Sequence, residues 1–290
     1  MIHRRAPAKL NLYLRVLGKR PDGYHEIETV FERLDLADEL TFEPARELTL
    51  LCDEPSLSCG EDNLVTRAAR ALQQATGTTA GARIQLTKRI PIAAGLGGGS
   101  SDAAATLLGL CDLWDLRVAR LRLLELAAGL GADVPFFLHG APFAIGRGRG
   151  ERCERLPATA HLVHVLVVPP ERLSTREVYG ALAWPLTAAA PSVKMIVHAL
   201  RNGSALAELA TGLWNDLQPE AIRRCPPIAV IQAQLRDHGC LGVSLSGSGP
   251  SVFGLCRDLA HAQTIADALR RMSASVWRIE VIQSDDPSTV

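Results

Sequence analysis

The sequence predicts an α/β (α+β) fold divided into two domains, residues 1–155 and 156–290. In the first half, a glycine-rich loop lies between a strand-like and a helix-like segment. The second half alternates strand and helix patterns in the order of two βαβ units. A chain of 290 residues is long enough for two domains and buries about 75% of its unfolded surface. Because no flexible linker separates the halves, we expect them to pack closely.

The first predicted strand, residues 8–17, alternates apolar and polar side chains with the period of two that a half-buried strand requires. Lys9 and Asn11 therefore project from the same side of this strand. A loop that contains Pro-Asp-Gly follows it. The other expected elements of the first half are strands over 26–43 and 82–90, helices over 63–75 (capped by Asp62 or Asn63), 103–116 and 121–129, a turn at 131–137 and an irregular segment over 141–150.

The second half opens with a β-branched run over 161–168 that Pro169-Pro170 ends, which is typical of a buried strand. Together with the segments after it, this strand predicts a ferredoxin-like α+β layer. The further elements expected are helices over 192–201, 205–217, 226–238 and 259–272, and strands over 241–246, 252–255 and 275–283.

The central motif lies between the strand over 82–90 and the helix over 103–116. Glycine lets the backbone approach a ligand closely, and a helix start offers free N–H groups and the positive end of a dipole to a phosphate. A tight turn capped by serine is the alternative. Three consecutive glycines followed by two hydroxyls favour a phosphate cradle made of Gly95, Leu96, Gly97, Gly98, Gly99, Ser100 and Ser101.

Other known phosphate loops do not match this motif. The dinucleotide fingerprint needs a glycine where Ser100 stands, the P-loop needs a following Gly-Lys, and a protein-kinase loop needs a lysine strand after it. The remaining pattern, P-x-x-x-G-L-G-G-G-S-S, resembles the ATP-binding motif of the GHMP small-molecule kinases. The resemblance implies ATP as co-substrate with Mg²⁺, an N-terminal ATP-binding domain, a ferredoxin-like C-terminal domain and an active site in the cleft between them.

Composition excludes several other classes of protein. The 31 basic and 31 acidic residues cancel, so the charge favours neither a nucleic-acid nor a membrane partner. The seven cysteines lack the spacing of a zinc site, which indicates free thiols in a reducing cytoplasm. The N-terminus has no apolar signal core, and the longest uncharged run, 239–256, is too rich in glycine and serine to span a membrane. We expect a cytoplasmic monomer or homodimer with a small-molecule substrate.

Phosphoryl transfer needs cations near the transferred group and a residue that orients or deprotonates the acceptor hydroxyl. Asp133 is the candidate base; alternatively it caps the turn that begins at Val134. Lys9 is the candidate cation; alternatively it is a solvated strand lysine. A hydroxyl for Mg²⁺ could come from Ser100 or Ser101, and Ser101 is the working choice.

Four segments together resemble one branch of the GHMP kinases, which phosphorylates the 2-hydroxyl of a cytidine-diphosphate-linked methylerythritol in the non-mevalonate isoprenoid route. Pro-Asp-Gly-Tyr24-His25 is the part that separates this branch from its relatives. Without the resemblance, Tyr24 and His25 would be either a recognition pair or merely an edge aromatic and a surface histidine. The four segments are 6–12 with 20–27, 90–104, 131–136 and 245–250.

The resemblance implies a role for each matching position. Asp133 would abstract or orient the proton of the acceptor hydroxyl, and Lys9 would keep it ionised and bridge towards the γ-phosphate. Asn11 would hydrogen-bond the methylerythritol end, while His25 would read the cytosine edge and Tyr24 would pack on its ring. The remaining positions are Thr175 and Tyr179 in the other cytidine wall and Asn63 and Lys88 in the adenosine pocket.

Two alternatives remain open at this stage. Another GHMP kinase, acting on a homoserine-like or mevalonate-like alcohol, would leave Tyr24 and His25 without a base to bind. A ligand sensor on the same scaffold would not need Asp133 or Lys9, which are both present.

Overall fold

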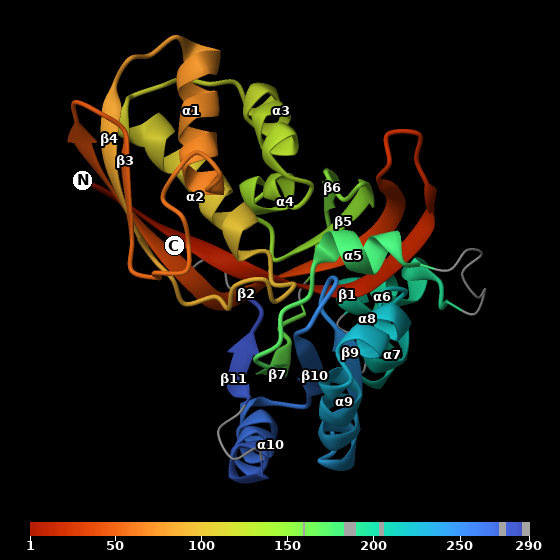
Figure 1. Cartoon of the computed structure of the whole chain (residues 1–290). Coiled ribbons are helices and arrows are strands. Elements are labelled where there is room, and N and C mark those ends of the chain that lie inside the picture. Colours follow the sequence, from red (N-terminus) through yellow and green to blue (C-terminus); the bar gives the residue numbers. More distant parts are fainter. Residues whose placement is uncertain (159, 183–189, 203–205, 273–276, 286–290) are drawn as a thin grey trace.

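The computed structural model describes residues 1–158, 160–182, 190–202, 206–272 and 277–285. These residues form four stacked layers: helices, a large sheet, a smaller sheet and further helices (Figure 1). One apolar core lies between each pair of neighbouring layers. The mixed helix-and-sheet fold and its two halves match the fold class expected from the sequence, whereas the division at residues 155 and 156 stays a prediction.

The large sheet is built around two long antiparallel strands, β1 (Ile2–Lys19) and β2 (His25–Ala45). The strand predicted over 8–17 is confirmed as part of β1, but it is not half-buried, because Lys9, Asn11 and Tyr13 on its polar side are buried too. Its path runs β3-β4-β2-β1-β8, and β5 pairs with both β2 and β6. The other strands are β3 (Thr49–Cys52), β4 (Gly81–Thr87), β5 (Phe143–Gly148), β6 (Arg152–Arg155) and β8 (Trp214–Asn215).

The expectation of an irregular segment over 141–150 is wrong, because β5 lies within it and forms a hairpin with β6, which follows it. Glycine and arginine alternate in this segment and hide its strand character. The glycines have a packing reason, since a Cβ on Gly146 would lie 2.6 Å from the Phe31 ring. Because glycine takes the place of an apolar side chain on the packed face, the strand lacks the apolar–polar alternation by which strands are predicted from sequence.

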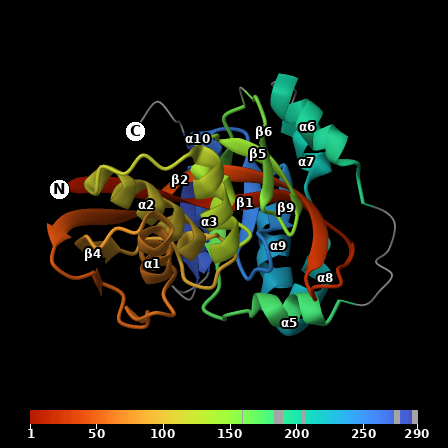
Figure 2. The ribbon, with the colours of Figure 1, turned by 90° about the horizontal axis from the view of Figure 1, so that it is seen from above.

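Four helices cover one face of the large sheet, and Figure 2 shows three of them, α1, α2 and α3, from above. The second of them begins at Gly98 rather than at residue 103, because Gly97 takes a left-handed φ of 71° and the residues after it are already helical. Gly98 to Asp102 are therefore the first turns of a helix and not a loop before it. The four helices are α1 (Leu64–Thr76), α2 (Gly98–Leu113), α3 (Arg120–Leu130) and α4 (Val134–Leu138).

The smaller sheet has the strand order β11-β7-β10-β9, with every neighbouring pair antiparallel. This order is that of two βαβ units and confirms the ferredoxin-like arrangement. Its elements are β7 (Val163–Val168), β9 (Gly242–Leu245), β10 (Val252–Cys256), β11 (Arg278–Gln283), α6 (Val193–Asn202), α9 (Pro227–Asp237) and α10 (Leu259–Met272). The expected first residues of a helix at 205 and of a strand at 275 lie outside the described residues.

Three features of the second half differ from expectation. The helix predicted over 205–217 stops as α7 (Leu206–Gly212), and the chain then enters the large sheet as β8, beside β1. Asn215 in β8 ties this strand to the end of β9 and the loop after it, since its side-chain amide donates to the carbonyls of Leu245 and Gly247 at 2.9 and 2.8 Å. Two short helices were not expected, α5 (Thr175–Gly180) and α8 (Gln218–Arg224).

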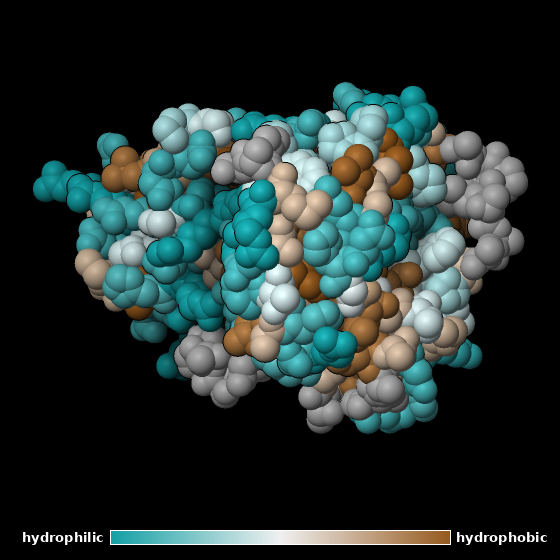
Figure 3. Space-filling model, turned by 90° about the horizontal axis from the view of Figure 1, so that it is seen from below, coloured by the Kyte–Doolittle hydropathy of each residue, from teal (hydrophilic) through white to brown (hydrophobic). Residues whose placement is uncertain are grey.

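The outer face of the lower helices is mainly hydrophilic, with apolar side chains scattered over it (Figure 3). Such scattering is normal for a protein surface. In the ranges that the structure describes, no helix is both long and apolar enough to cross a membrane.

Candidate active site

The glycine loop is shaped by backbone conformations that favour glycine. Gly95 and Gly97 have φ of 78° and 71°, in the left-handed region where other residues are strained. A Cβ on Gly95 would also overlap the carbonyl oxygen of Ser246. The loop therefore needs glycine both for its own conformation and for the close approach of a second loop.

That second loop, residues 246–250, comes from the other half of the chain and joins β9 to β10. The Ser246 hydroxyl donates to the Gly95 carbonyl at 3.0 Å, and a Cβ on Gly247 would lie 3.1 Å from the Lys9 ammonium. The sequence points to this loop as Gly247-Ser-Gly249-Pro, but assigns no site residue to it. Ser246 and Gly247 were thus missed, because only the tertiary fold places them on the glycine loop.

Lys9 lies at the centre of the site. Its side chain is 4% exposed, which excludes a solvated strand lysine. The ammonium donates to the Gly95 carbonyl at 2.7 Å and to the Asn11 side-chain oxygen, and it lies 3.9 Å from the Asp133 carboxylate. Burial lowers the pKa of Lys9, and the charge of Asp133 opposes that shift. Asn11 is fixed in turn by Thr29, whose hydroxyl accepts from its amide at 2.8 Å.

Asp133 immediately precedes α4, yet its side chain makes no capping hydrogen bond to that helix. The carboxylate, one-third exposed, instead lies beside Lys9. The β5–β6 turn adjoins its other side, since a Cβ on Gly150 would lie 3.8 Å from Asp133 Oδ1. The carboxylate is therefore available to a ligand, and the capping alternative is not realised.

The two candidate hydroxyls for Mg²⁺ point in different directions. Ser101 is 1% exposed, and its hydroxyl has no hydrogen-bond partner among the residues that the structure describes. It lines a cavity between α2, β1 and α4 together with Arg33 and Phe137. Ser100 Oγ instead lies 3.8 Å from where a Cβ on Gly131 would be, and so faces the segment that carries Asp133.

These oxygen donors fit Mg²⁺, which proteins usually hold through one or two carboxylates together with substrate phosphates. Among the described residues, no group of three or more histidine, cysteine, aspartate or glutamate side chains could hold a metal. The Ser100 hydroxyl, which faces the segment that carries Asp133, is thus an oxygen that could join the phosphates of a nucleotide around Mg²⁺.

Lys88 has its ammonium beneath the start of α2, where it bonds the carboxylates of Asp38 and, at 2.8 Å, Asp102. Burial alone would lower the pKa of Lys88, but the two carboxylates outweigh it and the pKa is raised. For Asp102, burial acts in the opposite direction and raises the pKa to about 7, although the positive charge of Lys88 favours the ionised carboxylate. Asp38 also accepts the backbone N–H groups of Arg89 and Ile90 at 2.6 and 2.8 Å, so the cluster anchors the strand end before the glycine loop.

Asn63, the other residue expected near adenosine, caps α1. Its side-chain oxygen accepts the Val65 N–H at 2.9 Å and its amide donates to the Ser58 carbonyl at 2.7 Å. The next residue, Leu64, lies 3.4 Å from where a Cβ on Gly99 would be. Asn63 and Lys88 therefore both lie near the start of α2, but their polar ends are already engaged.

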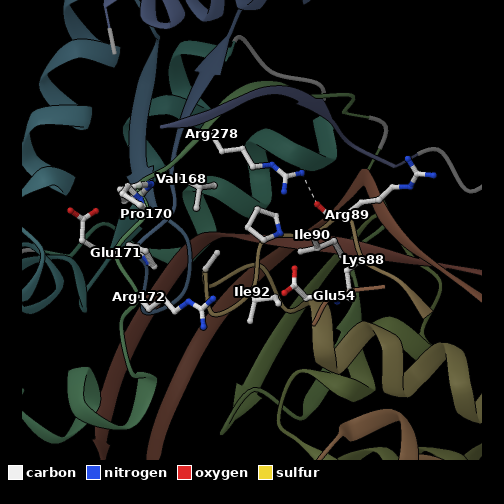
Figure 4. A pocket seen from close by; sticks show the side chains of 14 residues that line it. Glu54, Lys88, Arg89, Ile90, Ile92, Val168, Pro170, Glu171, Arg172 and Arg278 are labelled. Atoms are coloured by element: carbon white, nitrogen blue, oxygen red, sulfur yellow. Dashed lines mark hydrogen bonds between the residues drawn. The ribbon is translucent and has the colours of Figure 1, made fainter. Parts of the chain in front are cut away.

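A cavity of about 300 Å³ separates the segment before the glycine loop from the second half of the chain (Figure 4). Glu54 and Arg172 point into it from opposite sides, and Arg278 closes another edge by donating to the Arg89 carbonyl at 2.6 Å. Lys88 also lines this cavity.

The residues expected to contact cytidine come from distant parts of the chain. The rings of His25, at the start of β2, and Tyr179, in α5, have centroids 5.2 Å apart. Burial raises the pKa of Tyr179, and the charge of Asp133 adds to the effect. Thr175 bonds Ser248 of the second loop at 2.8 Å. Tyr24 is 56% exposed and stacks with Arg149.

Comparison with known proteins agrees with this arrangement. Residues 63–141 match the GHMP kinases N terminal domain, and residues 196–274 match the GHMP kinases C terminal domain. The chain is 46% identical over 273 residues to the 4-diphosphocytidyl-2-C-methyl-D-erythritol kinase of Pelotomaculum thermopropionicum, covering 93% of this chain and 94% of that protein. It is 41% identical over 274 residues to the kinase of the same name from Salinibacter ruber, covering 91% and 93%.

Solved structures give the same result. A crystal structure of 4-(cytidine 5'-diphospho)-2C-methyl-D-erythritol kinase superposes with a TM-score of 0.82 at 40% identity, covering 98% of this chain and all of that one. A homoserine kinase from Cytophaga hutchinsonii, at 21% identity and a TM-score of 0.76, shares the fold.

Proposed function

The chain belongs to the GHMP kinases, among the 4-diphosphocytidyl-2-C-methyl-D-erythritol kinases, and from this membership we propose its reaction. It transfers the γ-phosphoryl group of ATP to the 2-hydroxyl of 4-diphosphocytidyl-2-C-methyl-D-erythritol, a step of non-mevalonate isoprenoid biosynthesis. The observation that carries the proposal is the position of the Lys9 ammonium, 2.7 Å from the glycine-loop carbonyl of Gly95 and 3.9 Å from the Asp133 carboxylate. One buried cation thus joins the phosphate cradle to the group that receives the acceptor proton.

The phosphates of ATP lie on the segment 95–101, which joins the glycine turn to the first residues of α2, against the free N–H groups at the start of that helix. Lys9 is then placed between the γ-phosphate and Asp133, where it stabilises the charge of the phosphoryl group in transfer. Burial strengthens this effect, because a charge acts more strongly where water is excluded. Adenosine lies towards Asn63 and Lys88, with Lys88 supplying its stem and backbone because its ammonium is engaged by two carboxylates.

Asp133 takes or orients the proton of the 2-hydroxyl. Its carboxylate is partly exposed and makes no helix cap, so both oxygens are available to the substrate. Asn11, fixed by Thr29, contacts the methylerythritol end. The Ser100 hydroxyl would contribute to holding Mg²⁺ on the ATP phosphates, and the ion would neutralise part of their charge when bound.

The cytosine base lies at the wall formed by Tyr24, His25, Thr175 and Tyr179. The 5.2 Å ring contact between His25 and Tyr179 supports this placement, because it joins the Pro-Asp-Gly-Tyr-His segment to α5. We place the protein in a reducing cytoplasm, which agrees with its free cysteines at 52, 59, 111, 153, 225, 240 and 256.

The test is ADP release by the purified chain with ATP and Mg²⁺, comparing the cytidine compound with homoserine and mevalonate. We expect turnover with the cytidine compound alone. Turnover with only a simple alcohol would keep the roles of the glycine loop, Lys9 and Asp133 but remove the cytidine wall. ATP binding without turnover of any of the three would contradict the proposed reaction.

A further inference from the structure

Arg149 lies in the β5–β6 turn, which runs past both ends of the proposed substrate site. Gly148 and Gly150 on either side of it have φ of 75° and 114°, a left-handed backbone that favours glycine. The Arg149 N–H donates to the Glu151 carboxylate at 2.7 Å, which fixes the turn. Because β5 pairs with β2, with Gly148 opposite Ile27, the turn lies beside the β2 end that carries the base-reading residues (Figure 1).

The Arg149 side chain lies over the ring of Tyr24. Its guanidinium carbon is 4.8 Å from the ring centroid, within the range of a cation–π contact. Within the described ranges, the guanidinium makes one hydrogen bond, from Nη2 to the Ala128 carbonyl at 3.4 Å. Its single ion-pair partner there is Glu151, and at 3.9 Å that pair is long. Most of the five guanidinium donors therefore have no partner among the described residues.

The substrate geometry gives those donors a target. If cytosine lies at Tyr24 and the reacting hydroxyl lies at Asp133, the diphosphate that joins the two ends crosses the space between them. The turn spans the same interval, since Arg149 contacts Tyr24 while Gly150 lies against Asp133. A guanidinium matches the paired oxygens of a phosphate better than an ammonium does.

We propose that Arg149 binds the diphosphate of the cytidine substrate and, through the same guanidinium, holds the Tyr24 ring in place for the base. This inference rests on the proposed function. It makes Arg149 a specificity residue for a diphosphate-linked substrate, because a compact alcohol without a diphosphate would leave the guanidinium unused.

The neighbouring Arg147 provides a matched control. It lies in the same hairpin, two residues away, but its guanidinium pairs with Glu28 at 3.3 Å and with Glu154 at 3.5 Å. It therefore carries the same charge without facing the proposed diphosphate. Both ion pairs are partly exposed, so their loss affects stability little.

The experiment compares the full-length wild type with Arg149→Gln, Arg149→Lys and Arg147→Gln. We expect Arg149→Gln to raise KM for the cytidine compound about 10- to 100-fold, as loss of a charged hydrogen bond does, with KM for ATP unchanged. Arg149→Lys recovers part of the loss because the charge remains, and Arg147→Gln behaves as the wild type. A thermal melt of each variant checks that it folds.

Calorimetric binding of CDP and of cytidine separates the two roles and does not depend on turnover. Arg149→Gln should weaken CDP much more than cytidine, because cytidine lacks the diphosphate. Equal weakening of both, or none, would overturn the diphosphate assignment. If the wild type fails to turn over the cytidine compound, the proposed function fails first, and the contrast between CDP and cytidine still decides the role of Arg149.

Discussion

At the scale of single residues, the site depends on a lysine buried beside a carboxylate that stays accessible. Lys9 is 4% exposed whereas Asp133 is 33% exposed. The lysine cannot leave the glycine loop, whose carbonyl it bonds, while the carboxylate can meet a substrate hydroxyl. The proposed roles divide in the same way, with a fixed charge at Lys9 and proton transfer at Asp133, and each can be tested alone.

Replacing Asp133 with asparagine should lower kcat about 10²- to 10⁴-fold, the usual effect of losing a general base. The amide keeps the shape of the side chain but cannot take the proton, so KM for ATP should change little. Coupled ADP release measures both constants, and Glu125→Gln on the exposed face of α3 is the control. Unchanged turnover in Asp133→Asn would rule out its proposed role.

The lowered pKa of Lys9 predicts a pH limit on activity. A lysine with a lowered pKa keeps its proton below that pKa and loses it as pH rises, so activity that needs the ammonium falls at a lower pH than an ordinary lysine at 10.5 would allow. The profile of kcat/KM reports this group in the free enzyme. Lys9→Arg keeps its charge at all these pH values, and its alkaline limb should move upward. If the alkaline limb of the kcat/KM profile lies at the same pH in the wild type and in Lys9→Arg, that limb belongs to a group other than Lys9.

At the scale of elements, the start of each helix beside the site has a structural task as well as a proposed binding task. Asn63 caps α1, while Gly97 begins α2 with a left-handed turn. The segment 95–101, which includes the first residues of α2, is positioned by the helices α1 and α4 that pack on α2 and by the bond between Lys88 and Asp102.

Asn63→Ala should cost about 0.5–2 kcal/mol of stability, because the Val65 N–H loses its cap. Asn63→Ser restores a capping oxygen and should recover most of that stability. Chemical denaturation measures the loss, and KM for ATP is measured in parallel. A KM that rises in both variants would support the adenosine role, whereas a KM that follows stability alone would limit Asn63 to capping.

Gly95→Ala should weaken ATP binding strongly. A left-handed conformation costs a non-glycine residue about 1–2 kcal/mol, and the new Cβ would overlap the Ser246 carbonyl, so the two loops must separate. We expect KM for ATP to rise about tenfold or more. Gly129→Ala in α3, where a Cβ meets nothing within 4 Å, is the matched control. An unaltered KM in Gly95→Ala would contradict the packing of the two loops.

At the scale of the whole molecule, the two sheets are joined through buried polar contacts as well as the apolar core between them. Glu32 on β2 and His164 on β7 are both fully buried and lie 2.8 Å apart, and the Ser284 hydroxyl donates to the other Glu32 oxygen at 2.7 Å. Arg33 and Asp285 form a second buried pair at 2.7 Å. These contacts fix the smaller sheet against the large one. Because β7 pairs with β10, and the loop 246–250 leads into β10, they also help to hold that loop over the glycine loop.

Glu32→Leu should destabilise the protein by about 1–3 kcal/mol for each polar group left unsatisfied, His164 and Ser284. Urea unfolding gives the change, with the exposed Glu125→Gln expected within about 0.5 kcal/mol of wild type. A Glu32→Leu protein as stable as the wild type would show that the apolar core alone joins the sheets.

Local patterns were enough to predict many of the elements. The period-two alternation over 8–17 placed Lys9 and Asn11 on one side of a strand, and the glycines and serines after residue 90 located the loop and its helix. The ferredoxin-like layer of the second half was predicted from its βαβ pattern. Glycine spacing hid the β5–β6 hairpin, and the short helices α5 and α8 carry too few residues for a periodic signal.

The glycine loop, its flanking elements and the strand that carries Lys9 could be predicted from local sequence, because each depends on residues adjacent in the chain. The fold was needed to find that Lys9 is buried beside Asp133, that Ser246 rests on Gly95, that Ser101 turns inward and that Arg149 meets Tyr24. These contacts join residues far apart in sequence, and they exist because apolar faces on both sheets pack together and bring the loops at their edges into one place.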